Sequence, residues 1–304
     1  MTLAEELYPG TQKVEKNNSR AALWLLASAA LFTLMSVSVK YLGEEMHPFQ
    51  ISFFRLLVSL IVIWPFLMRM GGFRAGISTS VPGLQLLRGI VGSTAMVLGF
   101  YAIVHLPLAD AQAFSFSRNL FIVPLAFVLL SEAAGLRRTL ATLVGFAGVV
   151  IMLRPGGDMV LGLPVGAALG HAVLVAVATI LVNIASRYDR PVTLMFYTGV
   201  VGLMITAIPA IWVWKPVDIN DLILLFVMGT LGAMAHNCFI RAYAQGEASV
   251  IAPVDYTRLI MAAIAGYLLF SNVPDAYTVV GAAIIISSSF YLIRREAQLR
   301  VSQN

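Results

Sequence analysis

Two arginines, Arg118 and Arg258, stand deep inside long apolar runs of the sequence. A guanidinium group is planar, permanently charged and able to hold a carboxylate through two parallel hydrogen bonds. If such runs cross a membrane, a charge near the middle that faces lipid costs at least about 2.5–3.5 kcal/mol. We therefore expect both side chains to face a cavity or a partner, and we hypothesise that they bind an anionic group of a substrate, such as a carboxylate.

The acidic residue nearest to these arginines is Asp255, three positions before Arg258. This spacing places both side chains on one face of a helix and predicts an ion pair between them. Asp255 is also our candidate for a proton-coupling group, the alternative being a permanently ionised partner of Arg258. Arg118 has no acid three or four positions away, which favours it as the substrate contact. Arg55 and Arg88 lie nearer the ends of their runs, where we favour structural anchoring with the side chains reaching toward the headgroups.

Further polar residues inside apolar runs are candidate substrate contacts, because their polar atoms would be unpaired if they faced lipid. Phe114 precedes Arg118 by four positions and can stack on a substrate from the same helix face, with ordinary packing as the alternative. No arrangement of His, Cys and acidic residues has the spacing of a metal site, so we expect no metal and no cofactor. The remaining candidates are Ser115, Asn119, Tyr256, His171, His236 and Asn237.

The composition indicates which kind of secondary structure holds these residues. Hydrophobic residues make up 59% of the 304 residues and charged residues 12%, against roughly 45–50% and about 25% in a soluble domain. The chain is therefore expected to be an all-α integral membrane protein surrounded by lipid. Its net charge of +5 resides in short clusters between apolar runs, so we expect no nucleic-acid partner. No HExxH, GxSxG or Walker sequence supports the alternative of a membrane-embedded enzyme.

Ten apolar runs have the length of about 20 residues that a membrane-spanning helix needs. Lys and Arg gather in alternate loops and near both termini, which predicts that both termini are cytoplasmic in a bacterial-type inner membrane. We expect a cytoplasmic segment at 1–20, five-helix repeats at 21–154 and 158–295, and a cytoplasmic tail at 296–304. The predicted spans are 21–42, 49–69, 83–104, 108–130, 138–154, 160–186, 191–214, 220–243, 248–270 and 276–293.

The two halves show a faint internal repeat. A shift of 140 residues places FSRNL (116–120) on YTRLI (256–260) and so relates Arg118 to Arg258. Five spans in each half force the two copies into opposite orientations. Inverted repeats of this kind are found in many secondary transporters, where the substrate binds near the midplane between the halves.

Three segments carry a family resemblance: LLRGIVGSTAMVLGFYAIVHLPLADAQAFSF (86–116), RRTLATLVGFAGVVIMLRPG (137–156) and RAYAQGEASVIAPVDYTRLIMAAIAGYLLFSNVPDAYTVVGAAIIISSSFYLIRRE (241–296). They resemble the EamA family of the drug/metabolite transporter superfamily. The resemblance implies ten helices in two inverted repeats, a central cavity, and alternating access without ATP hydrolysis. The most similar subgroup contains uptake carriers for compounds such as S-adenosylmethionine and riboflavin, and also exporters of amino acids.

The sequence departs from the family pattern at two places. Arg118 and Asn119 stand where a small residue and a proline are common, and Asn272 replaces an acidic residue whose counterpart in the first half is Glu132. We expect Arg118 to contribute to substrate specificity.

Together these features predict a secondary active transporter for a small polar organic metabolite, with an amino acid or another carboxylate-bearing compound favoured. The alternative among carriers is an exporter of drug-like or cationic metabolites, and a channel is a further non-carrier alternative. The expected partners are the substrate, the lipid bilayer and H⁺ as a coupling ion. A monomer suffices for such a mechanism, and a weak homodimer is compatible with it.

Overall fold

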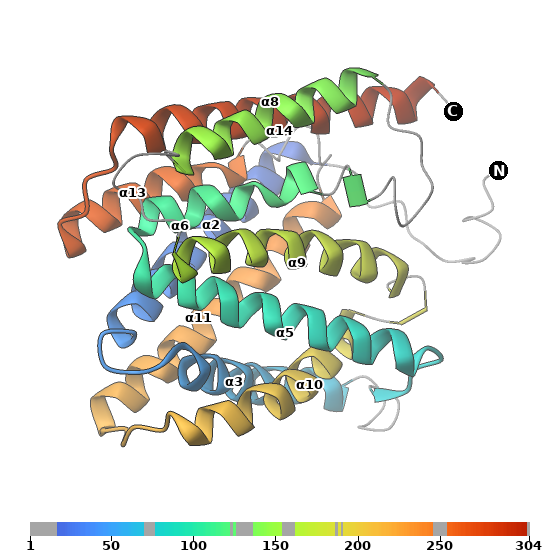
Figure 1. The fold of residues 1–304 in the computed structure, drawn as a ribbon. Helices are drawn as coiled ribbons and strands as arrows, with labels where there is room; N and C mark the ends of the chain where they lie inside the picture. Colours follow the sequence, from blue (N-terminus) through green and yellow to red (C-terminus); the bar gives the residue numbers. More distant parts are fainter. Residues whose placement is uncertain are drawn as a thin grey trace.

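The structure is a computed structural model, and it describes residues 17–69, 77–121, 124–125, 136–153, 162–185, 188–189, 191–245 and 254–302. Within these residues all regular structure is helical (Figure 1). The helices are α2 (Asn18–Leu42), α3 (Pro48–Arg69), α5 (Pro82–His105), α6 (Leu108–Phe116), α8 (Leu136–Leu153), α9 (Leu163–Ala185), α10 (Pro191–Trp212), α11 (Ile219–Gln245), α13 (Thr257–Phe270) and α14 (Ala276–Ser302).

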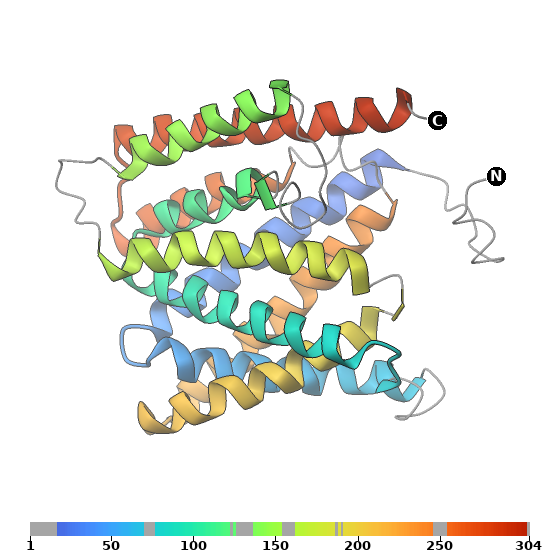
Figure 2. The same cartoon turned by 45° about the vertical axis from the view of Figure 1, so that its right-hand side comes forward.

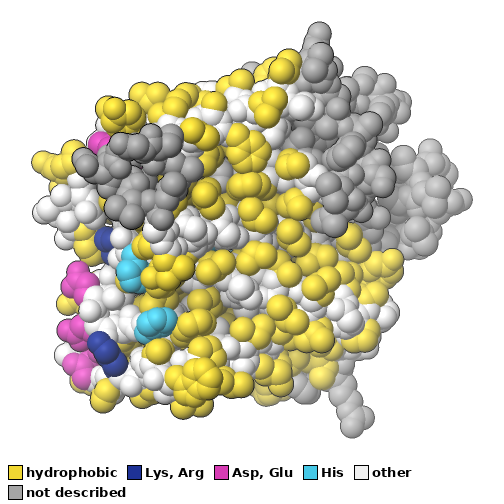
Figure 3. Space-filling view, in the orientation of Figure 1, with side chains coloured by type: hydrophobic (Ala, Val, Ile, Leu, Met, Phe, Trp, Pro, Cys, Tyr) yellow, Lys and Arg dark blue, Asp and Glu magenta, His cyan; other side chains and the backbone are white. Residues whose placement is uncertain are grey.

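The helices form a multi-pass membrane protein. Six of them are long and apolar enough to cross a membrane, and three shorter apolar helices accompany them among the described residues. Hydrophobic side chains cover most of the face shown in Figure 3, whereas charged and histidine side chains gather at one edge. The start of α2 and the end of α14 lie at the same end of the molecule (Figure 2).

Helices pack chiefly in pairs that are distant in sequence. The most extensive contacts are those of α2 with α11, α8 with α14, α5 with α9, and α3 with α10. The backbones of α8 and α14 approach so closely that a Cβ atom added to Gly148 would lie 2.8 Å from the carbonyl oxygen of Gly281. The helix bundle is thus held together by contacts between helices that are distant in sequence rather than by local contacts.

Two of the predicted spans, 108–130 and 248–270, are interrupted by a turn, and parts of both lie outside the described residues. Helix α6 ends at Phe116, a turn follows at Ser117, and residues 118–121 are helical again. Helix α13 begins only at Thr257, after a turn at Tyr256.

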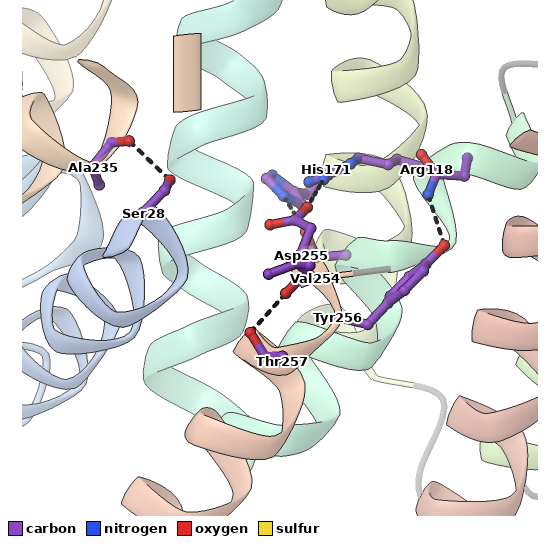
Figure 4. A network of polar contacts seen from close by, with 10 residues as sticks. Ser28, Arg118, His171, Ala235, Val254, Asp255, Tyr256 and Thr257 are labelled. Carbon is purple, nitrogen blue, oxygen red and sulfur yellow. Dashed lines mark hydrogen bonds and ion pairs between the residues drawn. The ribbon is translucent and has the colours of Figure 1, made fainter. Parts of the chain in front are cut away.

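The two breaks have the same local cause. The Ser117 hydroxyl donates to the carbonyl of Phe114 at 2.6 Å. The Thr257 hydroxyl donates to the carbonyl of Val254 at 2.7 Å (Figure 4). Such side-chain bonds to a carbonyl three residues back compete with the regular helical pattern. Ser117 and Thr257 are separated by the 140-residue offset of the predicted repeat, although the repeat itself and the domain bounds stay predictions.

The ends of the chain differ from the predicted spans in one respect. Helix α14 continues to Ser302, well beyond the predicted end at 293 and through most of the expected tail. Residues 1–16 and Glu132 lie outside the described residues.

Candidate functional site

A cavity of about 680 Å³ lies between the helices, and α2, α3, α5, α6, α9, α10, α11 and α13 contribute to its wall. This volume is within the range of about 300–1,000 Å³ that small-molecule sites occupy. Apolar side chains form much of the wall, including those of Phe32, Met96, Phe100 and Val175. Its charged side chains are those of Arg55, Arg118 and Arg258, and its polar side chains are Ser36, Ser93, Gln112, Ser115, Asn119, His171, Thr179, Thr198 and His236.

The helix breaks bring two arginines to this cavity. Arg118 follows the turn at Ser117 directly, and Arg258 lies in the first turn of α13. Both side chains line the cavity. Arg258 is 8% exposed, and its Nε atom is buried without a hydrogen-bond partner among the residues that the structure describes. The N-terminal end of a helix carries partial positive charge, so α13 adds to the positive potential beside Arg258.

The predicted ion pair between Asp255 and Arg258 was wrong. Asp255 pairs instead with Arg118, whose Nη2 atom lies 3.1 Å from Oδ2 of Asp255 (Figure 4). The turn at Tyr256 separates Asp255 from α13, so the two residues no longer share a regular helix face. Arg118 therefore has a carboxylate partner from the other half of the chain, which sequence spacing alone does not reveal.

The charges around the cavity are unbalanced. Arg55, Arg118 and Arg258 line it, whereas no acidic side chain does so among the described residues. Asp255 lies behind Arg118, 6% exposed, and is not part of the wall. The cavity is thus suited to a ligand that brings negative charge.

Phe116 is the aromatic residue that touches both arginines, and sequence reasoning missed it. The guanidinium carbons of Arg118 and Arg258 lie 5.5 and 5.1 Å from the centre of its ring. The Phe116 ring also lies 5.0 Å from that of Tyr256. Residues two positions apart do not face each other on a regular helix, so spacing alone did not predict this contact. Phe114, the predicted stacking residue, is completely buried and does not line the cavity, so its role is packing.

A polar chain connects α6, α9 and α5 along the cavity wall. The Ser115 hydroxyl lies 3.1 Å from Nε2 of His171, and Nδ1 of His171 lies 2.7 Å from the carbonyl oxygen of Ala95. Gly99 leaves space for the imidazole, since an added Cβ would lie 2.6 Å from Nδ1 of His171. The candidates Ser115 and His171 are thus brought together at the cavity.

The other candidates have different placements. Asn119 lines the cavity and donates a hydrogen bond of 3.4 Å to the Tyr256 hydroxyl, whereas Tyr256 is buried behind the wall. His236 lines the cavity from α11. Its neighbour Asn237 is exposed and does not line the cavity.

The two remaining arginines of the apolar runs have separate roles. Arg55 was expected to reach the headgroups, but its side chain lines the cavity, 2.9 Å from the sulfur of Met96 and 5.9 Å from the centre of the Phe100 ring. Arg88 is buried and donates to the side chain of Gln85 and to the backbone carbonyl of Leu194. Arg88 thus links α5 to α10, as a structural residue would.

Comparison with known proteins gives consistent results over nearly the whole chain. The model of the EamA-like transporter family matches residues 19–154 and 163–294. An S-adenosylmethionine uptake transporter of Rickettsia prowazekii is 30% identical, the match covering 92% of this chain and 95% of the relative. A riboflavin transporter of Vibrio cholerae is 28% identical (92% and 94% covered), and a pseudopaline exporter of Pseudomonas aeruginosa is 28% identical (89% and 95% covered).

One solved crystal structure shares the fold. It aligns with a TM-score of 0.61 over 92% of this chain and 99% of its own, at 17% sequence identity.

Proposed function

Because the chain belongs to the EamA-like transporter family, a family of transporters rather than enzymes, we propose that it is a secondary active transporter for a small organic metabolite that carries a carboxylate or another anionic group. It moves this substrate across the inner membrane by alternating access. The relatives named above transport different compounds in different directions, so we leave the direction of transport open in this proposal.

The positive cavity is the observation that carries the proposed substrate class. Three arginines line its wall and the described residues contribute no acid to it. Cationic metabolites, the substrates of the alternative carrier, would be repelled by this arrangement. An anionic group would instead compensate guanidinium groups that are otherwise poorly paired, which is a favourable exchange inside a membrane.

Arg118 and Arg258 are placed to receive that anionic group together. Both follow helix breaks, and both contact the ring of Phe116. Broken helices at the midplane are the usual place of substrate binding in transporters with repeats. We assign the apolar wall around Phe32 and Phe100 to the rest of the substrate.

Asp255 gives the proposed transporter a means of coupling to protons. Its carboxylate is bound to Arg118 at 3.1 Å, so the carboxylate and an anionic substrate group compete for the same guanidinium. Protonation of Asp255 would release Arg118 for the substrate, and loss of that proton would favour release of the substrate. In this scheme a proton and the substrate bind together.

Counterflow in proteoliposomes tests the proposed function. Proteoliposomes that are preloaded with an unlabelled carboxylate metabolite should take up the labelled compound faster than empty ones. A channel would show no such stimulation, and an enzyme would form product. Arg118→Ala and Arg258→Ala should each reduce the exchange rate at least about tenfold, as expected from loss of a charge-assisted bond.

The matched control is Arg241→Ala, which removes an exposed arginine of α11 that contacts Trp24 outside the cavity. This variant should exchange substrate at the wild-type rate. Equal exchange by wild type, Arg118→Ala and Arg258→Ala, with matched protein levels in the vesicles, would overturn the proposed role of the arginines.

A further inference from the structure

We propose that Lys40 closes one end of the substrate cavity, and that its hydrogen bonds to the end of α5 break when the cavity opens there. This inference rests on the proposed function, because a closing contact has this role only in a transporter that works by alternating access. It assigns a gating role to a lysine that lies outside the cavity wall.

The wall of the cavity is buried at one end and accessible toward the other. Helices α2 and α5 finish at the end of the bundle where α9 begins (Figure 2), and we call this the Lys40 end. Near it the cavity-lining residues Ile103 and Ala111 are 8% and 6% exposed. Toward the opposite end Val182, close to the end of α9, lines the cavity and is 39% exposed, and Thr179 is exposed as well. The cavity is thus closed at the Lys40 end and accessible toward the other.

Lys40 holds the closed end together through the last carbonyls of α5. Its Nζ atom donates to the carbonyl oxygens of Ile103, Val104 and Leu106 at 3.2, 3.4 and 2.7 Å. The last carbonyls of a helix have no partner within that helix, and a lysine side chain can bond them. An ammonium group has three protons, so these bonds use its full donor capacity. Because Ile103 is also part of the cavity wall, the contact lies directly at the closed end.

Close packing of the same two helix ends supports the closure. Gly43 caps α2, and a Cβ atom added to it would overlap the side chain of Val104. Valine is β-branched and has few rotamers, so its side chain cannot turn aside freely. Glycine at position 43 therefore lets the end of α2 lie against the end of α5, where Lys40 bonds it.

The closure also involves the helix that carries Arg258. The Nζ atom of Lys40 lies 5.6 Å from the centre of the Phe270 ring, and Phe270 is the last residue of α13. Arg258 lies in the first turn of the same helix. Helix α13 thereby joins the Lys40 end to an arginine of the substrate site, so a shift of α13 on substrate binding would act on both.

The alternative role of Lys40 is a helix cap that only adds stability. Loss of a cap would fray α5 locally and leave the opposite end of the cavity unchanged. Loss of a gate contact would instead favour the form that is open at the Lys40 end over the form that is open at the opposite end. Accessibility at both ends of the cavity therefore separates the two roles.

Cysteine labelling of the full-length protein from each side of the membrane tests the inference. Ala111→Cys and Thr179→Cys report the two ends of the cavity, each in the Cys238→Ala background, which removes the single cysteine. A membrane-impermeant maleimide is applied to intact cells and to inside-out membrane vesicles. Labelling of Glu45→Cys, in the connection between α2 and α3, shows which preparation presents the Lys40 end.

With Lys40 in place, Ala111→Cys should be protected in the preparation that presents the Lys40 end, and Thr179→Cys should react in the other. Lys40→Met removes the ammonium group but keeps a long side chain. It should raise the labelling rate of Ala111→Cys at least about fivefold, as expected from the loss of even one net hydrogen bond, and should lower that of Thr179→Cys. Gly43→Ala should shift both rates in the same directions, so it carries the test if Lys40→Met does not fold.

Lys215→Met is the matched control. Lys215 is an exposed lysine in the connection between α10 and α11, at the same end of the bundle, and its hydrogen bonds with Gln50 are made by its backbone. The substitution removes the same charge without affecting the Lys40 contacts. Both labelling rates should therefore stay at the wild-type level.

Several results would overturn the inference. They are labelling of Ala111→Cys from the Lys40 end while Lys40 is present, unchanged labelling in both Lys40→Met and Gly43→Ala, no decrease at Thr179→Cys, or equal effects of Lys215→Met and Lys40→Met. Failure of the proposed function has a different signature, because the wild-type protein would then show no counterflow whatever the labelling pattern.

Discussion

At the scale of single residues, the site depends on a phenyl ring between two cations. Phe116 is 1% exposed and contacts the guanidinium groups of Arg118 and Arg258 together. Two like charges that contact one aromatic ring repel each other, so the ring compensates part of a repulsion that would otherwise separate them. An anionic substrate group would relieve the same repulsion, and Phe116 thereby positions the arginines for binding.

Phe116→Leu should separate this positioning role from ordinary packing. Each cation–π contact contributes roughly 0.5–2 kcal/mol, so the affinity for an anionic substrate should fall about fivefold to tenfold. Phe114→Leu is the matched control, since Phe114 is equally buried on α6 and, like Phe116, outside the cavity wall, but makes no cation–π contact with Arg118 or Arg258. Both variants should lose similar thermal stability, and titration of labelled substrate should show weaker binding for Phe116→Leu alone. Equal affinities in the two variants would refute the role.

Asp255 and Arg118 should show strong energetic coupling. The two side chains are 8% and 19% exposed, and removal of one partner from a buried pair leaves the other charge uncompensated, at a cost of about 3 kcal/mol. The double variant should therefore lose clearly less stability than the sum of the losses in Asp255→Ala and Arg118→Ala. Thermal denaturation of both single variants and the double variant measures this coupling, and strict additivity would contradict it.

At the scale of elements, the helix breaks decide which residues meet. The long helices could be predicted from apolar run length alone: the span at 83–104 corresponds to α5, Pro82–His105. The breaks could not, because Ser117 and Thr257 bond to their own backbone without any change in hydropathy. The ion pair of Arg118 with Asp255 could not be predicted either, because the three-residue spacing favoured Arg258 as the partner of Asp255.

The contact between α5 and α9 gives an element-scale prediction. A Cβ atom at Gly99 would lie 2.6 Å from Nδ1 of His171, so Gly99→Ala should displace the imidazole and break its bond to the Ala95 carbonyl. We expect weaker substrate binding, by about fivefold or more for one lost hydrogen bond, in a protein that still folds. Titration of wild type and variant with the same substrate gives the comparison.

Gly166→Ala provides the control for Gly99→Ala. Gly166 is an exposed residue of α9, and no heavy atom outside its own helix turn approaches an added Cβ within 4 Å. Alanine should raise helix stability there by about 0.5–1 kcal/mol and leave substrate affinity unchanged. If Gly99→Ala behaved like Gly166→Ala, the position of the His171 ring would not matter for binding.

At the scale of the whole molecule, polar contacts link neighbouring segments near each end of the helix bundle. At the end away from the start of α2, the Lys40 ammonium donates to the carbonyls of Ile103, Val104 and Leu106 at 2.7–3.4 Å. At the opposite end, Asp189 accepts hydrogen bonds from Thr79 and Gln85. The proposed alternating access requires that such contacts form and break in turn at two ends that face different compartments.

The proposed orientation puts the end that contains Asp189, where α2 starts and α14 ends, in the cytoplasm. Cys238 is the single cysteine of the chain, so Cys238→Ala gives a background for new cysteines at exposed positions. Glu45→Cys, in the connection between α2 and α3, should react with a membrane-impermeant maleimide in intact cells. Tyr188→Cys, between α9 and α10, should react only after the inner membrane has been permeabilised.

This labelling pattern follows from the charge of the connections, because Lys and Arg are retained on the cytoplasmic side during insertion. Cys238→Ala without a new cysteine corrects for background labelling, and transport by each variant confirms that the orientation is that of functional protein. The reverse pattern, with Tyr188→Cys labelled in intact cells and Glu45→Cys protected, would place both termini outside and overturn the orientation while leaving the cavity and its arginines unaffected.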